Sequence, residues 1–292
     1  MTPQGSRESV ACTYLILTDE ANLQHTRKAA FFVCGGAFFP ADCIGTICQG
    51  VERIREAAGY LPGEPFKSAS SSKPDRIPMD TFTQAKNDVF ELAREMGVRF
   101  IAYCVPHEIA RNRTDEERFY WGMHATVTHF HRFIELRGVE TSGIVVCDQL
   151  PFPDKFSLLG EFNHHSGRTV DGQTPHRPLT QLYMFATTPI NGSHAASVSD
   201  ILLGGFRYCV NEPNRTQAAA AIFPKLFPLI WGSECADGRA ILESGLIIRP
   251  KHIGKPKFRA LIDSLVYDLE QLASARIYED LVWEYQDGYV EG

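Results

Sequence analysis

Two apolar runs joined by a short polar link stand near the start of the chain and limit the folds open to it. Residues 14–17 form the first run, and residues 29–39 form the second, A-A-F-F-V-C-G-G-A-F-F. Two such runs around a polar turn are typical of adjacent antiparallel strands. The first run leads into Asp19 and Glu20, which we expect at its carboxyl end, where the chain turns. Because successive side chains of a strand point to opposite faces, only one of these carboxylates can reach a given site.

The composition indicates an ordinary folded protein. The chain has 292 residues, 44% of them hydrophobic, which is enough for a large core in one or two domains. With 35 acidic and 29 basic residues the net charge is −6, which excludes a protein that coats nucleic acid non-specifically but not an enzyme with a local basic groove. No apolar run reaches the ~18 residues that span a bilayer, and the first ten residues lack the apolar core of a secretory signal. We therefore expect no membrane partner.

The cysteines indicate a reducing compartment. The chain has 8 cysteines, and none forms a C-x-x-C pair. Cys34, Cys104 and Cys147 lie inside apolar runs, where a free cysteine behaves as a small hydrophobic residue. This pattern argues against a disulfide framework and against a zinc knuckle, so we expect a cytoplasmic protein.

Beyond the opening hairpin, helical and strand patterns alternate. The apolar spacing predicts helices over residues 41–58, 81–96, 116–136, 196–210, 217–231 and from 256 to about 285. Strands are predicted over residues 64–70, 99–105, 143–147 and 182–187, with an irregular loop over 149–178. The first strand is expected to pair with the second strand on one side and with strand 99–105 or 143–147 on the other.

This alternation predicts an α/β fold, a mixed sheet with an antiparallel opening hairpin and helices on both faces. We expect a core over residues 12–212. Residues 213–292 are expected to form a C-terminal helical extension packed on that core, so that the chain is one structural unit.

Three aspartates share one structural context. Asp19 follows the first strand, Asp148 follows the strand 143–147, and Asp200 lies near the start of the helix 196–210. Ligands of open α/β sheets bind at the carboxyl ends of strands. Carboxylates gathered there raise one another's pKa unless a cation neutralises them, and Mg²⁺ or Mn²⁺ prefers carboxylate oxygens. Two such ions about 4 Å apart cleave phosphodiesters. The alternatives are a turn for Asp19, a strand cap for Asp148, and a surface position or a pairing with Arg207 for Asp200.

Three motifs follow one another over residues 14–210. They are L-T-D-E-A-N with F-V-C-G-G-A-F, then I-V-V-C-D-Q, then A-S-V-S-D-I-L-L-G-G. Their order resembles the domain-of-unknown-function family 3800, whose fold is ribonuclease H-like. That family has a strand ending D-E-S-G before a G-G strand, a later strand ending in Asp, and a helix of the form L-Q-L-A-D-L-V-A-G. The chain departs from it at Ala21 and Asn22, in place of Ser and Gly, and at Ser197 and Ser199, in place of Gln and Ala.

This resemblance implies a ribonuclease H-like fold and a metal-dependent nuclease or phosphodiesterase. It assigns Asp19, Asp148 and Asp200 as catalytic ligands of one or two Mg²⁺ or Mn²⁺ ions, Glu20 as an assisting carboxylate and Glu64 as a fourth metal ligand. Nucleic acid is the partner that this chemistry implies. A fold does not dictate activity, so a binding or regulatory module of a defence or mobile-element system, with weak or no catalysis, is the alternative. The oligomeric state stays open, a homodimer included.

Two further clusters are weaker candidates. The three histidines of H-A-T-V-T-H-F-H, residues 124–131, lack the H-E-x-x-H spacing, so scattered histidines on a helix surface are preferred to a zinc site. The run K-H-I-G-K-P-K-F-R, residues 251–259, is either a solvated face or a contact for a phosphate backbone. Lys67 and Lys73 are candidates of the same kind.

Overall fold

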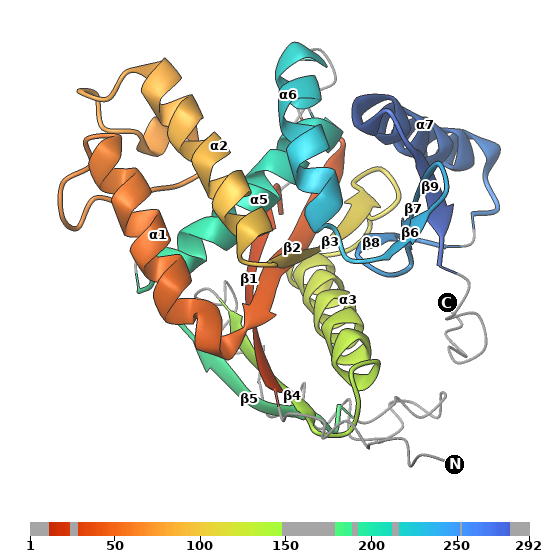
Figure 1. Ribbon diagram of the computed structural model, residues 1–292. Coiled ribbons are helices and arrows are strands. Elements are labelled where there is room, and N and C mark those ends of the chain that lie inside the picture. The colour runs from red at the N-terminus through yellow and green to blue at the C-terminus, as the bar shows by residue number, and fades with distance from the viewer. Residues whose placement is uncertain are drawn as a thin grey trace.

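The computed structural model describes residues 12–23, 29–147, 179–188, 192–211, 216–251 and 253–280 (Figure 1). The strands are β1 (Cys12–Ala21), β2 (Phe31–Pro40), β3 (Arg99–Pro106), β4 (Thr141–Cys147), β5 (Leu182–Thr187), β6 (Ser233–Cys235), β7 (Gly238–Leu242), β8 (Leu246–Ile248) and β9 (Arg276–Glu279). The helices are α1 (Ile44–Ala57), α2 (Met79–Glu95), α3 (Asp115–Glu135), α5 (His194–Asn211), α6 (Thr216–Leu226) and α7 (Pro256–Ala273).

The opening hairpin is confirmed. Strands β1 and β2 pair antiparallel, from Tyr14 opposite Pro40 to Ala21 opposite Val33. Strand β1 is longer than its apolar run, however, so the turn predicted at Asp19 is wrong. The long apolar run of β2 continues past that point and supplies ladder partners, and hydrogen bonding to a partner keeps polar residues in a strand where their own propensity favours a turn.

The sheet has the order β5-β4-β1-β2-β3-β8-β7-β6, and β9 pairs with β7. Strand β4 is parallel to β1, and β5 is parallel to β4, whereas β3 is antiparallel to β2. Strand β2 therefore runs opposite to β1, β3, β4 and β5. This order and these directions confirm the ribonuclease H-like α/β class. They also identify β4, not β3, as the second neighbour of β1.

Helices cover both faces of the sheet, with α1, α2 and α5 on one side of β1 and β2 and α3 on the other (Figure 1). The alternation of β1 divides its side chains between two cores. Leu15 and Leu17 belong to the larger core, which includes buried residues of α1, α2 and α5, and Ile16 belongs to the core beneath α3. Burying a side chain of this size contributes roughly 1.5–3 kcal/mol, so the alternation sets which face each residue of β1 takes.

The C-terminal segment widens the sheet, which corrects the expectation of a helical extension. Strand β8 runs parallel to β3, with Ala102 opposite Leu246, and β7, β6 and β9 continue from it. Helix α7 ends at Ala273, and Ser274 follows with a left-handed φ of 52° before β9 begins. Strands β6 and β8 have 3 residues each, too few for an alternating pattern to be read from the sequence.

Most other predicted elements lie within a few residues of their expected limits, but two differ. Residues 64–69 do not form a strand, because Pro65 lacks a backbone donor and this stretch is held by side-chain contacts instead. Helix α6 ends at Leu226 and a 3₁₀ turn, Phe227–Leu229, replaces its predicted last turns, because Pro228 cannot donate to a helix. The predicted loop 149–178 lies outside the described residues. None of the helices described is long and apolar enough to cross a membrane.

Candidate functional site

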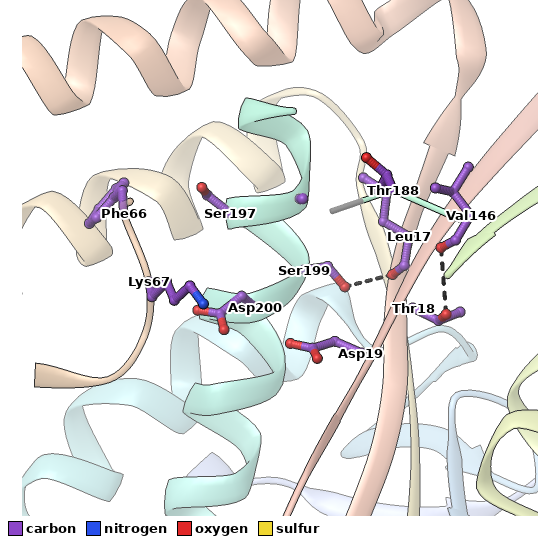
Figure 2. Close-up of a pocket in the computed structure, with 11 residues that line it drawn as sticks. Leu17, Thr18, Asp19, Phe66, Lys67, Val146, Thr188, Ser197, Ser199 and Asp200 are labelled. Atoms are coloured by element: carbon purple, nitrogen blue, oxygen red, sulfur yellow. Dashed lines mark hydrogen bonds between the residues drawn. The ribbon is translucent and has the colours of Figure 1, made fainter. Parts of the chain in front are cut away.

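A small cavity lies where the carboxyl half of β1 meets the first turns of α5 (Figure 2). Its volume is about 30 Å³, which is room for an ion or about two water molecules but not for a nucleotide. The lining residues are Leu17, Thr18, Asp19, Phe66, Lys67, Val146, Thr188, Ala196, Ser197, Ser199 and Asp200. Two of the three predicted aspartates, Asp19 and Asp200, therefore share one cavity.

Strand alternation places Asp19 on the α5 side of the sheet. Leu17, two residues earlier, lies in the core that includes α5, so Asp19 takes the same face. The register partner of Asp19 is Gly35, and paired residues share one face of the sheet. A Cβ added at Gly35 would lie 3.1 Å from the side chain of Leu203 in α5, so this shared face is the one that α5 covers. One Asp19 oxygen, Oδ1, accepts a hydrogen bond from the Glu20 N–H at 2.9 Å. In Figure 2 the Asp19 side chain points from β1 toward α5.

Glu20 takes the opposite face. Its register partner is Cys34, which belongs to the core beneath α3 and lies 3.9 Å from Oγ1 of Thr126. Burial raises the pKa of Cys34 well above its usual range, and the charge of Glu20 adds to that effect. Glu20 does not line the cavity that holds Asp19. The structure thus separates the adjacent carboxylates, as the alternation of a strand requires.

Asp200 lies in the second turn of α5 and reaches a loop on the other side of the cavity. Its Oδ2 accepts a short hydrogen bond from the backbone N–H of Ser68. Burial raises the pKa of Asp200, while hydrogen bonds from Ser68 and the charges of Lys67 and Arg207 oppose the rise. The elevated pKa agrees with the sequence-based expectation, but its main cause is burial rather than repulsion between carboxylates.

Two lysines balance the charge of Asp200. Lys67 lines the cavity, and Figure 2 shows its ammonium group beside the Asp200 carboxylate. Lys86 is half-buried, with Nζ at 3.4 Å from the Ser68 carbonyl oxygen and 4.4 Å from the centre of the Phe82 ring. Burial lowers the pKa of Lys86, and the charge of Asp200 opposes this shift. The protein therefore supplies cations of its own to this carboxylate.

Of the other two predicted ligands, only Glu64 lies among the described residues. Asp148 lies outside them; the residue before it, Cys147, ends β4 opposite Thr18 of β1. Glu64 is described, and it does not line the cavity. Its carboxylate binds Arg76, with one contact of 2.7 Å, and accepts from the Leu61 N–H at 2.7 Å, and these bonds lower the pKa of Glu64 to about 2.

The chemistry of the cavity fits a hard divalent cation. Among the described residues, no group of three or more His, Cys, Asp or Glu side chains is arranged to hold a metal ion. Asp19 and Asp200 nevertheless offer carboxylate oxygens to one space. Mg²⁺ is commonly bound by one or two carboxylates while it keeps several waters. Two carboxylates that line a space large enough for one ion are therefore a partial ligand set for Mg²⁺ or Mn²⁺.

Sequence reasoning assigned no role to Ser199, which precedes Asp200. The Ser199 side chain is buried, its Oγ donates to the Leu17 carbonyl at 2.6 Å, and it accepts from the Ala37 N–H at 3.2 Å. One signal was available in the sequence. Ser199 lies next to Val198 and close to Ile201 in an apolar stretch of helix, where a hydroxyl needs an internal partner.

The weaker clusters have structural partners. His124, His129 and His131 are buried, which corrects their expected place on a helix surface, because α3 packs on the strands β1 to β4 of the sheet. Nδ1 of His129 donates to the Ser244 carbonyl at 3.0 Å. In the basic run 251–259, Lys251 pairs with an acidic residue of β9 at 2.7 Å, and Lys257 pairs with one that follows β3 at 2.5 Å.

Comparisons with known proteins assign the chain to no family. No protein-family model matches the chain, and no curated protein matches it. Among solved structures, the chain is similar to a mutant of a ribonuclease HIII designated Bst-RNase HIII, with 11% identity and a TM-score of 0.38 over 73% of this chain. The chain covers 61% of the length of that protein. Strand order and strand directions define the class as an α/β protein of ribonuclease H-like topology, and its cavity brings together one carboxylate from β1 and one from α5.

Proposed function

We propose that this protein is a metal-dependent nuclease or related phosphodiesterase that uses Asp19 and Asp200 to hold one or two Mg²⁺ or Mn²⁺ ions. One observation carries the proposal. Two aspartates that are far apart in sequence, one on β1 and one on α5, line the same small cavity. Carboxylates that share one enclosed space raise one another's pKa, and a bound Mg²⁺ or Mn²⁺ ion would offset that repulsion.

The residues of the cavity have distinct tasks in this proposal. A bound ion would supply activated water and charge stabilisation for phosphodiester cleavage. Asp19 would hold the ion from the rigid strand β1, and Asp200 would hold it from α5. The Ser68 N–H orients the Asp200 carboxylate by binding Oδ2, and Ser199 ties α5 to β1 beside both ligands. A site held by packed elements in this way keeps its geometry without the ion.

Two sequence-based expectations extend the proposal. The resemblance to family 3800 makes Asp148 a third ligand, and we propose membership of that family on the order of its motifs. Nucleic acid is the proposed partner, because a carboxylate-bound divalent ion is the machinery of phosphodiester cleavage. Glu20 and Glu64 are less favoured as ligands, since the first lies on the other face of β1 and the second is engaged by Arg76.

Isosteric substitutions test the proposal. Asp19→Asn, Asp200→Asn and Asp148→Asn keep the shape of each side chain and remove the charge that holds an ion. We expect each to abolish Mn²⁺-dependent cleavage of labelled single- and double-stranded DNA, RNA and RNA–DNA hybrids, whereas Asp263→Asn on the exposed side of α7 keeps it. A folded Asp200→Asn protein that cleaves like the parent contradicts the mechanism. A wild-type protein that binds these substrates without cleaving them favours the binding module instead.

Thermal stability gives a second readout that does not depend on choosing a substrate. An ion that binds only the folded state raises the free energy of unfolding by mass action, by about 2.7 kcal/mol when its concentration is a hundredfold above its Kd. The melting temperature rises as a result. We expect millimolar Mg²⁺ or Mn²⁺ to raise the melting temperature of the wild type but not of the Asp19→Asn and Asp200→Asn proteins. An unchanged wild-type melting temperature argues against an ion site.

A further inference from the structure

The loop of residues 64–69 is anchored on both sides of Lys67. Before it, Phe66 is 2% exposed and packs against the rings of Tyr60 and Phe82, with centroids 5.1 and 6.4 Å away. After it, the Ser68 N–H binds Asp200, and an added Cβ at Gly204 would lie 2.3 Å from the Ser68 Cβ. The backbone of Lys67 is thus held against α5, next to the cavity.

The head group of Lys67 differs from those of the nearby lysines. The Lys73 ammonium donates to the carbonyl oxygens of Pro74 and Ile77 at 3.1 and 2.6 Å, and the Lys86 ammonium lies at the Ser68 carbonyl. For Lys67, the described part of the chain offers the charge of Asp200 but no hydrogen-bond acceptor in contact. Among the described residues, the hydrogen-bond donors of the Lys67 ammonium are therefore unused where this residue lines the cavity.

We infer that Lys67 is a phosphate-binding residue beside this cavity: it neutralises Asp200 while the cavity holds no ion, and it binds a non-bridging oxygen of a phosphodiester outside the cavity once an ion occupies the carboxylates. This inference rests on the proposed nuclease function. The two aspartates offset the charge of one divalent ion, so a cation from the protein adds the net positive charge that attracts an anionic phosphate. A lysine on a four-carbon stem can move between two such acceptors while its backbone stays fixed.

Removing the charge of Lys67 is expected to change the binding of Mn²⁺ and of the phosphodiester in opposite directions. A purely structural ion pair with Asp200 would not have this effect. If Lys67 competes with the metal ion for Asp200, removing its charge tightens Mn²⁺ binding. If Lys67 also binds the phosphodiester, the same change weakens substrate binding. The contact would be to the nucleic-acid backbone, so the loss is expected for every base sequence.

The test measures Mn²⁺ affinity by electron paramagnetic resonance, without substrate, and then KM for a short labelled oligonucleotide. Lys67→Met keeps the apolar stem, Lys67→Arg keeps the charge, and Lys73→Met is the matched control on the same stretch of chain. For Lys67→Met we expect Mn²⁺ to bind about three- to tenfold more tightly, as loss of a cation a few ångströms away implies. We expect its KM to rise about tenfold or more, while Lys67→Arg and Lys73→Met stay near the wild type.

The outcomes separate this inference from the proposed function. If the wild type binds Mn²⁺ and Lys67→Met binds it equally or more weakly, Lys67 is only a structural partner of Asp200 and the inference is overturned, while the nuclease proposal stands. An unchanged KM in Lys67→Met overturns it as well. If the wild type binds no Mn²⁺ at millimolar concentration, both proposals fall. Should Lys67→Met not fold, Lys67→Gln replaces it in both measurements.

Discussion

The Ser199 hydroxyl donates a hydrogen bond to the Leu17 carbonyl at 2.6 Å and accepts one from the Ala37 N–H at 3.2 Å. Leu17 and Ala37 are register partners in the β1–β2 ladder, so this one hydroxyl ties α5 to both strands. Leu17 lies two residues before Asp19, and Ser199 lies one residue before Asp200. The relative positions of the two carboxylates therefore depend on this contact.

Removing the Ser199 hydroxyl is predicted to loosen the site. Ser199→Ala leaves the bond to the Leu17 carbonyl unmade in a buried place, which typically costs about 1–3 kcal/mol of unfolding free energy. Ser197→Ala on the same helix is the control and is expected to stay within about 0.5 kcal/mol. Urea denaturation measures both, and Mn²⁺ titration of the folded Ser199→Ala protein should show weaker binding. Equal stability of the two variants would mean that the bridge contributes nothing.

A methyl group at Gly204 is predicted to displace the loop that carries Lys67. An added Cβ there would lie 2.2 Å from the Ser68 Oγ and 2.3 Å from its Cβ, so the loop must move. Gly204→Ala should therefore destabilise the protein by about 1–3 kcal/mol, although Ala is the better helix former. Gly45→Ala in α1 is the control, since nothing lies within 4 Å of its added Cβ.

The cause of that loss can be isolated with a double variant. Ser68→Gly removes the side chain that the new methyl group meets, so Gly204→Ala combined with Ser68→Gly should be more stable than the sum of the two single effects predicts. Chemical denaturation of the four proteins gives this coupling energy. Simple additivity would contradict the contact between the loop and α5.

Asp200→Asn is predicted to keep or raise the melting temperature in metal-free buffer. Burial disfavours the charged carboxylate, as the raised pKa of Asp200 indicates, and Asn removes that charge while it retains an oxygen for the Ser68 N–H. Scanning calorimetry in chelator-treated buffer measures the effect, with Asp263→Asn as an exposed control. A large drop in melting temperature would instead identify Asp200 as a structural ion-pair partner of the two lysines.

Acidification is predicted to destabilise the protein through His129. Burial, followed by the charges of Arg132 and Arg249, lowers the pKa of His129 well below its usual range. Near pH 6.5 the unfolded chain takes up a proton on this histidine that the folded protein does not bind. The contribution of neutral His129 to the free energy of unfolding is therefore complete above that pH. It is lost as the pH falls further, by up to about 1.4 kcal/mol per pH unit.

His129→Gln tests this dependence. The free energy of unfolding, followed by urea denaturation from pH 8 to pH 5, should fall less steeply in His129→Gln than in the wild type, whatever the stability of the variant at pH 8. His194→Gln is the control, because the His194 side chain is 40% exposed. Parallel pH profiles for the wild type and His129→Gln would show that another group is responsible.

The opening hairpin, the helices α1, α2, α3 and α5 and the strands β3, β4 and β5 could be predicted from the sequence, because each has enough apolar residues at one period to carry its own signal. The short strands β6 to β9 could not, since they form only where neighbouring strands supply backbone partners. The same reason explains the stretch after Glu64, where a strand-like pattern finds no ladder.

For the site, the sequence alone determined that Asp19 and Glu20 take opposite faces, because that follows from the two-residue period of any strand. The sequence also identified Asp19 and Asp200 as candidates for one shared site, although it placed Asp19 in a turn and the structure places it within β1. Only the tertiary structure decided what surrounds them. Ser68 and Asp200 are 132 residues apart in sequence, and Ser199 and Leu17 are 182 apart, yet both pairs share a hydrogen bond. Such contacts depend on how whole helices pack on the sheet, and no local pattern records that packing.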